Sequence, residues 1–344
     1  MFTRVANAGH VLLAVALSAT AGVVGPVTTA SAAPVPQAAS TSCPMQMLRS
    51  PSWTQRADIA DADPTGRYQV GHAYDTTYTT HLLRWTNGVP QDLGITYTGA
   101  SGVNTQGDIV GTITSGDDLT GTGWRYHEGE FTSLPGLTAQ AESYPSAINA
   151  DGAVAGASSL GSATVPVAWS TDGTVRQLAL LPGDTSGRAN DIDDDGTLVG
   201  FSSGASGEHA VRWLPDGTVE RLQEADPAHS STAVSIRNGN VLGQDIPGIG
   251  VTSSLLWRAG ATNAEQLSDG TPQAVNLRGA VVELTLPDAK LWMTEPDGTV
   301  RSLPTDRTPY ATGGVTALTD DGVAYGHWNS TPVSWDCRPL VSAP

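Results

Sequence analysis

Apolar and polar residues alternate along most of this chain in short runs, and Gly-rich turns separate the runs. In residues 189–222 the alternation predicts four β-strands, with the sequences ANDID, TLVGFSS, EHAVRW and TVERL. DDDG joins the first pair of strands and PDG joins the last pair. Asp-Gly accepts the positive φ that a tight hairpin requires. Because no helical heptads accompany this pattern, the chain is predicted to be all-β.

The first hairpin of this unit recurs along the chain. The clearest copies are GVNTQGDIVG at 102–111, AINADGAVAG at 147–156, DIDDDGTLVG at 191–200, SIRNGNVLG at 235–243 and ALTDDGVAYG at 317–326. Degenerate copies at 61–71 and 275–283 bring the number to seven.

A series of tryptophans follows the hairpins at a steady offset, with spacings of 35 to 45 residues. A period of about 40 to 45 residues with four strands is that of a propeller blade. The sequence therefore predicts a seven-bladed β-propeller of four-stranded antiparallel blades. We expect the tryptophans in its packing core, not around a ligand. They are Trp85, Trp124, Trp169, Trp213, Trp257, Trp292 and Trp335.

The seventh unit is incomplete, because WDCRPL at 335–340 has no fourth strand after it. CPMQML at 43–48 fits that missing strand, and the alignment sets Cys43 and Cys337 two positions apart across a hairpin turn. That separation suits a disulfide. We therefore predict that an N-terminal strand and a Cys43–Cys337 disulfide close the ring.

The ends and the charge of the chain predict its compartment. Residues 1–32 have the pattern of a signal peptide, residues 33–42 that of a flexible tail, and residues 43–344 form a single propeller. No later apolar run is long enough to span a bilayer. A net charge of −17 argues against nucleic acid or an anionic membrane surface as partner. We expect a secreted monomer, extracellular or associated with the cell wall.

The repeat resembles the HAF repeat of extracellular bacterial proteins, in which Ala-x-x-Ile-Asn-x-x-Gly-x-Val-x-Gly precedes His-Ala-Phe-x-Trp. AINADGAVAG and EHAVRW match it best, and the resemblance covers the chain from residue 43 onward. The His survives only at His81 and His209, the Phe nowhere, and Glu283 replaces a Gly in the sixth copy. The resemblance implies an extracellular propeller and says little about activity. The plan is also similar to that of secreted actinobacterial propellers that provoke protease autolysis and are cross-linked by a transglutaminase.

Motifs for chemistry are sparse. GFSSG at 200–204 matches the serine-hydrolase elbow around Ser202, but that elbow needs a strand, a turn and a helix. No catalytic residue is therefore predicted, although abundant carboxylates leave glycoside hydrolase or lyase chemistry open. The one candidate cofactor is calcium, at Asp191, Asp193 and Asp195, whose alternate spacing begins calcium loops. An acidic hairpin turn is the competing interpretation.

Propeller geometry predicts where a partner binds. The connections between second and third strands, and between blades, lie on one face and read as long loops, as in HAYDTTYTTH at 72–81, SLGSATVP at 159–166 and QDIPGIGVTS at 244–253. Such loops on a rigid scaffold are common recognition sites. The candidates on them are Tyr74, Tyr78, Asp117, Asp118, Tyr144, Asp184, Arg188 and Asp245.

Three function classes follow from these patterns. The first is a non-catalytic binding protein for an extracellular protein or glycan. The second is an enzyme that uses acids around the central channel. The third is a modulator of a secreted protease, or an envelope protein cross-linked by a transglutaminase, for which Gln37 in the N-terminal tail is the candidate glutamine.

Overall fold

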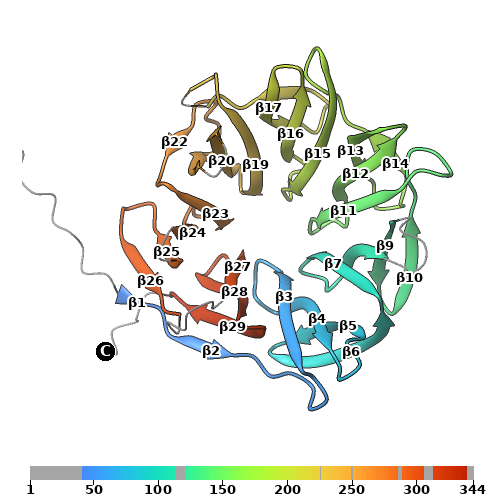
Figure 1. Cartoon of the computed structure of the whole chain (residues 1–344), viewed down its shortest axis with the longest axis vertical. Coiled ribbons are helices and arrows are strands. Elements are labelled where there is room, and N and C mark those ends of the chain that lie inside the picture. The colour runs from blue at the N-terminus through green and yellow to red at the C-terminus, as the bar shows by residue number, and fades with distance from the viewer. Residues whose placement is uncertain are drawn as a thin grey trace, which may run out of the picture. The chain divides into compact units, whose positions relative to one another are not determined.

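The computed structural model describes residues 41–113, 121–224, 226–248, 251–285, 289–305 and 313–338, all within the unit Ala38–Pro344. Their strands form seven sheets that stand as blades around a central axis (Figure 1). The predicted seven-bladed β-propeller is therefore confirmed. The described part of the chain has no helix long and apolar enough to cross a membrane.

The first four blades each take four consecutive antiparallel strands. From the innermost strand outward, they are β3 (Arg56–Ala62), β4 (Tyr68–Tyr74), β5 (Thr80–Thr86) and β6 (Val89–Thr96); β7 (Thr98–Val103), β8 (Ile109–Ile113), β9 (Thr122–His127) and β10 (Glu130–Leu134); β11 (Ser143–Ile148), β12 (Val154–Leu160), β13 (Ala163–Trp169) and β14 (Val175–Gln177); β15 (Asp184–Ile192), β16 (Leu198–Gly204), β17 (Gly207–Trp213) and β18 (Val219–Arg221).

The remaining blades also receive the two N-terminal strands, β1 (Thr41–Ser42) and β2 (Met45–Met47). From the innermost strand outward, their other strands are β19 (Ser230–Arg237), β20 (Asn240–Gly248), β21 (Val251–Trp257) and β22 (Glu265–Gln266); β23 (Gly270–Val275), β24 (Val281–Thr285), β25 (Lys290–Thr294) and β26 (Val300–Leu303); β27 (Gly313–Leu318), β28 (Val323–Trp328) and β29 (Thr331–Asp336).

The ring closes as the sequence predicts. Strand β2 is the outer strand of the seventh blade and pairs antiparallel with β29, with Met45 opposite Trp335 (Figure 1). Continuing that register sets Cys43 opposite Cys337, and the two form a disulfide with a Cα–Cα distance of 4.7 Å. The tail boundary differs from the prediction, because Thr41–Ser42 already pairs in parallel with β26 of the sixth blade.

The repeated Gly at the end of each hairpin motif has a packing reason. Every innermost strand carries a register shift at the same point, and in six blades a Gly lies opposite it. At Gly200 an added Cβ would lie 1.9 Å from the carbonyl oxygen of Arg188 and 3.0 Å from Cα of Ala189. The shifted strand therefore leaves no room for a side chain. In the sixth blade Glu283 takes this position, opposite Pro272.

Five of the seven tryptophans hold neighbouring blades together. Each is buried and donates its indole N–H to a carbonyl of the connection that leads from the preceding blade, at 2.6 to 3.0 Å. They are Trp85, Trp169, Trp213, Trp257 and Trp335.

The other two tryptophans lie two residues earlier on their strands. Trp124 lies opposite Gly111, stays buried and donates to Thr98 Oγ1 at 2.7 Å. Trp292 lies opposite Glu283 and is only half-buried, so the prediction that it is core is wrong. This displacement accounts for two of the residues by which the spacing of 35 before Trp292 is short.

The connections on the two faces of the ring differ less in length than predicted. We call the face with the first-to-second and third-to-fourth turns the turn face, and the other the connection face. Two of the segments predicted as long loops on the connection face are mostly strand. In the third blade only residues 161–162 separate β12 from β13, and in the fifth β20 extends to Gly248 and β21 starts at Val251. A longer described loop between second and third strands is 75–79 in the first blade.

Candidate functional site

The predicted ligand-face residues fall into separate groups. Asp117, Asp118 and Gln37 lie outside the described residues. Asp184 and Asp245 are both bonded within their own blades: Ser202 donates to Asp184 at 2.6 Å, and His229 Nδ1 lies 2.9 Å from Asp245, which is buried. These two carboxylates contribute to packing between strands and connections.

Tyr144 and Arg188 lie near one another on the innermost strands of adjacent blades. The Arg188 Nε donates to Ser146 Oγ at 3.0 Å. The Tyr144 hydroxyl donates to Glu142, and that hydrogen bond is the main cause that raises the pKa of Tyr144 to about 12. The sequence motifs did not predict that these two candidates lie so close.

Tyr74 and Tyr78 lie at the loop of the first blade. The Asp75 carboxylate accepts hydrogen bonds from Thr77 N, Thr77 Oγ1 and Thr79 N at 2.7 to 2.9 Å. The Thr77 hydroxyl is the largest cause that lowers the pKa of Asp75 to about 2. This network holds Tyr78 at a φ of 62°, a region that few bulky residues adopt, with 72% of its surface exposed. The Arg56 guanidinium lies 5.8 Å from the centre of the Tyr78 ring.

A pocket of about 280 Å³ opens beside this loop, between the first and the seventh blade. We call it the seam pocket. Its polar lining residues are Arg56, Asp58, Tyr74, His327 and Ser330.

The donors of the seam pocket are unusual in lacking partners. His327 Nδ1 is buried without a hydrogen-bond partner among the described residues. The Arg56 side chain has no ion pair there, apart from its contact with the Tyr78 ring. A buried polar group without a partner costs free energy, so His327 Nδ1 is a local cost to the stability of the ring, whereas the Arg56 side chain is exposed.

The Asp58 carboxylate points toward the second blade. Ala100 N–H donates to His72 Nε2, so His72 carries its proton on Nδ1 and donates it to Asp58 Oδ1 at 2.9 Å. Asp58 Oδ2 has no donor among the described residues. The carboxylate is therefore oriented, on the side of β3 opposite to the Ala57 and Ile59 side chains, which pack with Tyr325 of the seventh blade.

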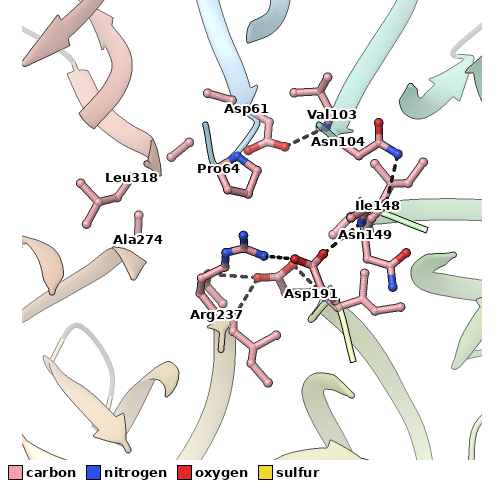
Figure 2. A pocket seen from close by; sticks show the side chains of 18 of the residues that line it. Asp61, Pro64, Val103, Asn104, Ile148, Asn149, Asp191, Arg237, Ala274 and Leu318 are labelled. Carbon is pink, nitrogen blue, oxygen red and sulfur yellow. Dashed lines mark hydrogen bonds and ion pairs between the residues drawn. The ribbon is translucent and has the colours of Figure 1, made fainter. Parts of the chain in front are cut away.

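A second cavity lies on the axis of the ring, and the innermost strands of all seven blades line it (Figure 2). Its volume is about 110 Å³, against roughly 300 to 1,000 Å³ for pockets that hold small molecules. A space of that size holds a few water molecules. We call it the axial cavity.

The carboxyl groups of Asp61 and Asp191 both line the axial cavity. The sequence analysis did not predict that these two residues lie in one site. Asp61 accepts from Val103 N–H of the next blade at 2.8 Å, and Asp191 accepts from Ile236 N–H of its next blade at 2.8 Å (Figure 2). Each keeps some surface toward the cavity, but the ring encloses both. Burial raises the pKa of Asp61 to about 8 and that of Asp191 to about 6. The shared Asp-x-Asp of residues 61–63 and 191–193 was the available signal.

Arg237 crosses the mouth of the axial cavity on the turn face. It donates to Asp194 at 2.6 Å, from the fourth blade, and to Asp320 at 3.0 and 3.3 Å, from the seventh. The ion pairs therefore connect three blades. The polar groups of this cavity therefore stabilise the contacts between blades.

The calcium candidates diverge within the acidic turn. Asp191 accepts from Ile236 N, Asp193 from Asn238 N and Gly239 N, and Asp195 from Thr197 N. No three His, Cys, Asp or Glu residues in the described ranges form a group that could hold a metal ion.

Ser202 is fully buried in β16. It donates to Asp184 and accepts the N–H of Leu181 at 3.0 Å. No described helix follows its strand, so the fold does not make the nucleophile elbow that GFSSG matches formally.

No protein-family model and no curated protein matches this chain. Solved propellers resemble it at low identity. A streptogramin B lyase is 12% identical, with 85% of this chain and 97% of that chain covered and a TM-score of 0.57. The virginiamycin B lyase from Staphylococcus aureus is 9% identical over 85% and 97% of the two chains, with a TM-score of 0.55. YCF48 bound to D1 peptide is 14% identical over 88% and 97%, with a TM-score of 0.53. At these identities the likeness concerns the fold alone.

Proposed function

We propose that this protein is a secreted binding protein without catalytic activity, which takes an extracellular protein or glycan partner on its connection face. One observation carries the proposal. The seam pocket and the Tyr78 loop offer an exposed aromatic ring and polar groups without partners, whereas the carboxyls of the axial cavity are bonded between blades. Exposed aromatic side chains beside unpaired polar groups are typical of recognition surfaces.

Secretion is supported by the signal-peptide pattern of residues 1–32 and by the disulfide, which persists in oxidising compartments. The HAF-repeat resemblance points the same way and stays a prediction. Among the fold neighbours, YCF48 is named for a bound peptide and two others are named as lyases, so the fold itself is compatible with binding and with catalysis.

A capture experiment with matched variants tests the proposal. Immobilised wild-type protein, Tyr78→Ala and Val89→Ala are exposed to culture supernatant and to solubilised cell wall. Val89 is 62% exposed at the start of β6 and serves as the control on the turn face. We expect one partner to be retained by the wild type and by Val89→Ala and lost with Tyr78→Ala.

Two results would overturn the proposal. Equal retention by all three proteins would move the binding surface away from the connection face. Turnover in a panel of polysaccharide and peptide substrates, abolished by Asp61→Asn, would instead establish the enzyme alternative with chemistry at the axial cavity.

A further inference from the structure

An apolar pocket opens between the first and the second blade, beside their outermost strands β6 and β10. We call it the rim pocket. It shares no lining residue with the seam pocket and includes none of the loop 75–79. Its volume is about 240 Å³, and it is lined by Ile95, Ile113, Thr122, Gly123, Trp124, Phe131, Thr132 and Ser133.

The side chains on one side of the second blade face this pocket. The register sets Ile113 opposite Thr122, and Trp124 follows Thr122 by two residues, so all three lie on the same side of the sheet. Phe131 lies opposite Tyr126 on that side, and its ring centre lies 5.3 Å from that of Trp124 and 4.8 Å from that of Tyr126. This side packs against the first blade, because Trp124 and Tyr126 share a buried cluster with residues of β4, β5 and β6.

The composition and the size of the rim pocket define the group that fits it. No charged side chain lines it. Because an apolar cavity of about 150 Å³ holds a benzene molecule, a volume of about 240 Å³ accommodates one aromatic or branched aliphatic side chain. Ile113 and Phe131 are 42% and 38% exposed, so covering them with such a side chain is favourable.

The strand beside the pocket has a free edge. β10 is the outermost strand of the second blade (Figure 1). A two-residue turn with positive φ at both positions joins it to β9. Thr132 therefore bonds to β9, whereas the backbone N–H and C=O groups of Phe131 and Ser133 point away from it. These groups have no backbone partner among the residues that the structure describes.

The other described outer strands are less suited to pairing with a further strand. β2, β14, β18 and β22 have two or three residues each, and β1 pairs along the edge of β26. β6 has eight residues, but Pro90 lacks an N–H, and Gly94 has a φ of 73° beside a register shift. β10 contains no Pro and pairs with β9 over five residues without a shift. Its edge is therefore the most regular one for a partner strand.

The charges favour a basic partner over a second copy of this chain. Glu128 and Glu130 are exposed at the start of β10, and neither has an ion pair among the described residues. Two copies of the chain, each with a net charge of −17, repel one another. Phe131 of a second copy also packs against its own Trp124 and is not free to enter a pocket. A segment that carries Lys or Arg is attracted instead.

We propose that β10 and the rim pocket bind an extended peptide segment of another protein, which adds a fifth strand to the second blade. Phe131 and Ser133 bond to the backbone of the peptide, and the rim pocket takes one aromatic or branched aliphatic side chain. The two glutamates attract a basic residue of the same segment. Backbone bonds to a sheet edge combined with a pocket for a side chain are a recurring mode of peptide recognition. This surface goes beyond the proposed function, which concerns the connection face.

Selection from a displayed library of random heptapeptides tests the proposal, followed by calorimetric titration of a synthetic peptide with the enriched sequence. We expect the enriched peptides to share one large apolar residue and a Lys or Arg. Ser133→Pro removes an outward N–H without breaking a bond to β9, and Thr122→Phe fills the pocket. Each should weaken binding at least roughly tenfold.

Gln177→Pro is the matched control, because Gln177 is exposed and holds the position in β14 that Ser133 holds in β10. It should leave the affinity unchanged. Thermal unfolding shows whether each variant is folded, and Thr122→Phe decides the test if Ser133→Pro does not fold.

Several outcomes would overturn the peptide site. They are no enrichment above an unrelated protein, enriched peptides without a large apolar residue, and equal affinities of Thr122→Phe and the wild type. A dimer of the wild type in sedimentation that Ser133→Pro abolishes would assign the edge to a second copy instead. Each of these results leaves the Tyr78-dependent capture of a partner, and with it the proposed function, standing.

Discussion

Removal of the Cys43–Cys337 disulfide should lower the stability of the ring by a large and calculable amount. The bond joins residues 294 apart in sequence. If it acts by restricting the unfolded chain, closing a loop of that length contributes about 5 to 6 kcal/mol at 25 °C. For a ring of roughly 300 residues with an unfolding entropy of about 2.1 cal/mol/K per residue, this corresponds to a decrease in Tm of roughly 9 °C.

The assay is thermal and chemical unfolding of the wild type, Cys43→Ala, Cys337→Ala and the double variant. Because both residues act through one bond, we expect the same loss in all three variants and no further loss in the double variant. Two truncations separate the bond from the strand. Removal of residues 1–40 should leave the stability unchanged. Removal through Leu48 should cost more than either Cys→Ala change, since it also removes β2 and uncovers the edge of β29.

Three results would refute this reasoning. A decrease in Tm of only about 1 or 2 °C would show that the seam is held without the bond. Additive losses in the double variant would show that the cysteines act separately. Equal stability of the two truncations would show that β2 is not needed to complete the seventh blade.

Two further changes test the packing and the electrostatics of the ring. Gly200→Ala should lower the free energy of unfolding by more than about 3 kcal/mol, because its Cβ would meet the backbone of Arg188 at 1.9 Å. In the control Gly99→Ala the nearest neighbour of the Cβ would be Thr112 O at 3.9 Å, so the free energy of unfolding should change by less than about 1 kcal/mol. Equal losses in the two variants would contradict the close approach at Gly200. Because the pKa of Asp61 in the folded protein, about 8, is above the unfolded value of about 3.9, its contribution to stability is complete below pH of about 4 and is lost as the pH rises to about 8. Asp61→Asn should therefore flatten the dependence of unfolding free energy on pH across that range, and parallel curves for the two proteins would exclude Asp61 as its origin.

The sequence predicted the fold because local rules repeat seven times. Asp-Gly and Asn-Gly pairs specify hairpins, and alternation specifies which strand face is buried, so each blade can be recognised from its own residues. The closing strand was also predictable. The seventh unit lacks one strand and the N-terminus supplies one, with a cysteine at each matching position. Hydrophobic burial and turn geometry are encoded within a few residues of where they act.

The tertiary structure alone decided how distant residues meet. Arg56 and His327 are 271 positions apart in sequence and share a pocket only because the first and seventh blades become neighbours. The same closure brings Asp61 and Asp191, from different blades, to one axial cavity. Residues 244–248 and 251–253, predicted as part of a long loop, lie in β20 and β21, because polar residues still pair when a neighbouring strand offers hydrogen bonds. Contacts of this kind depend on the assembled ring, so no local pattern records them.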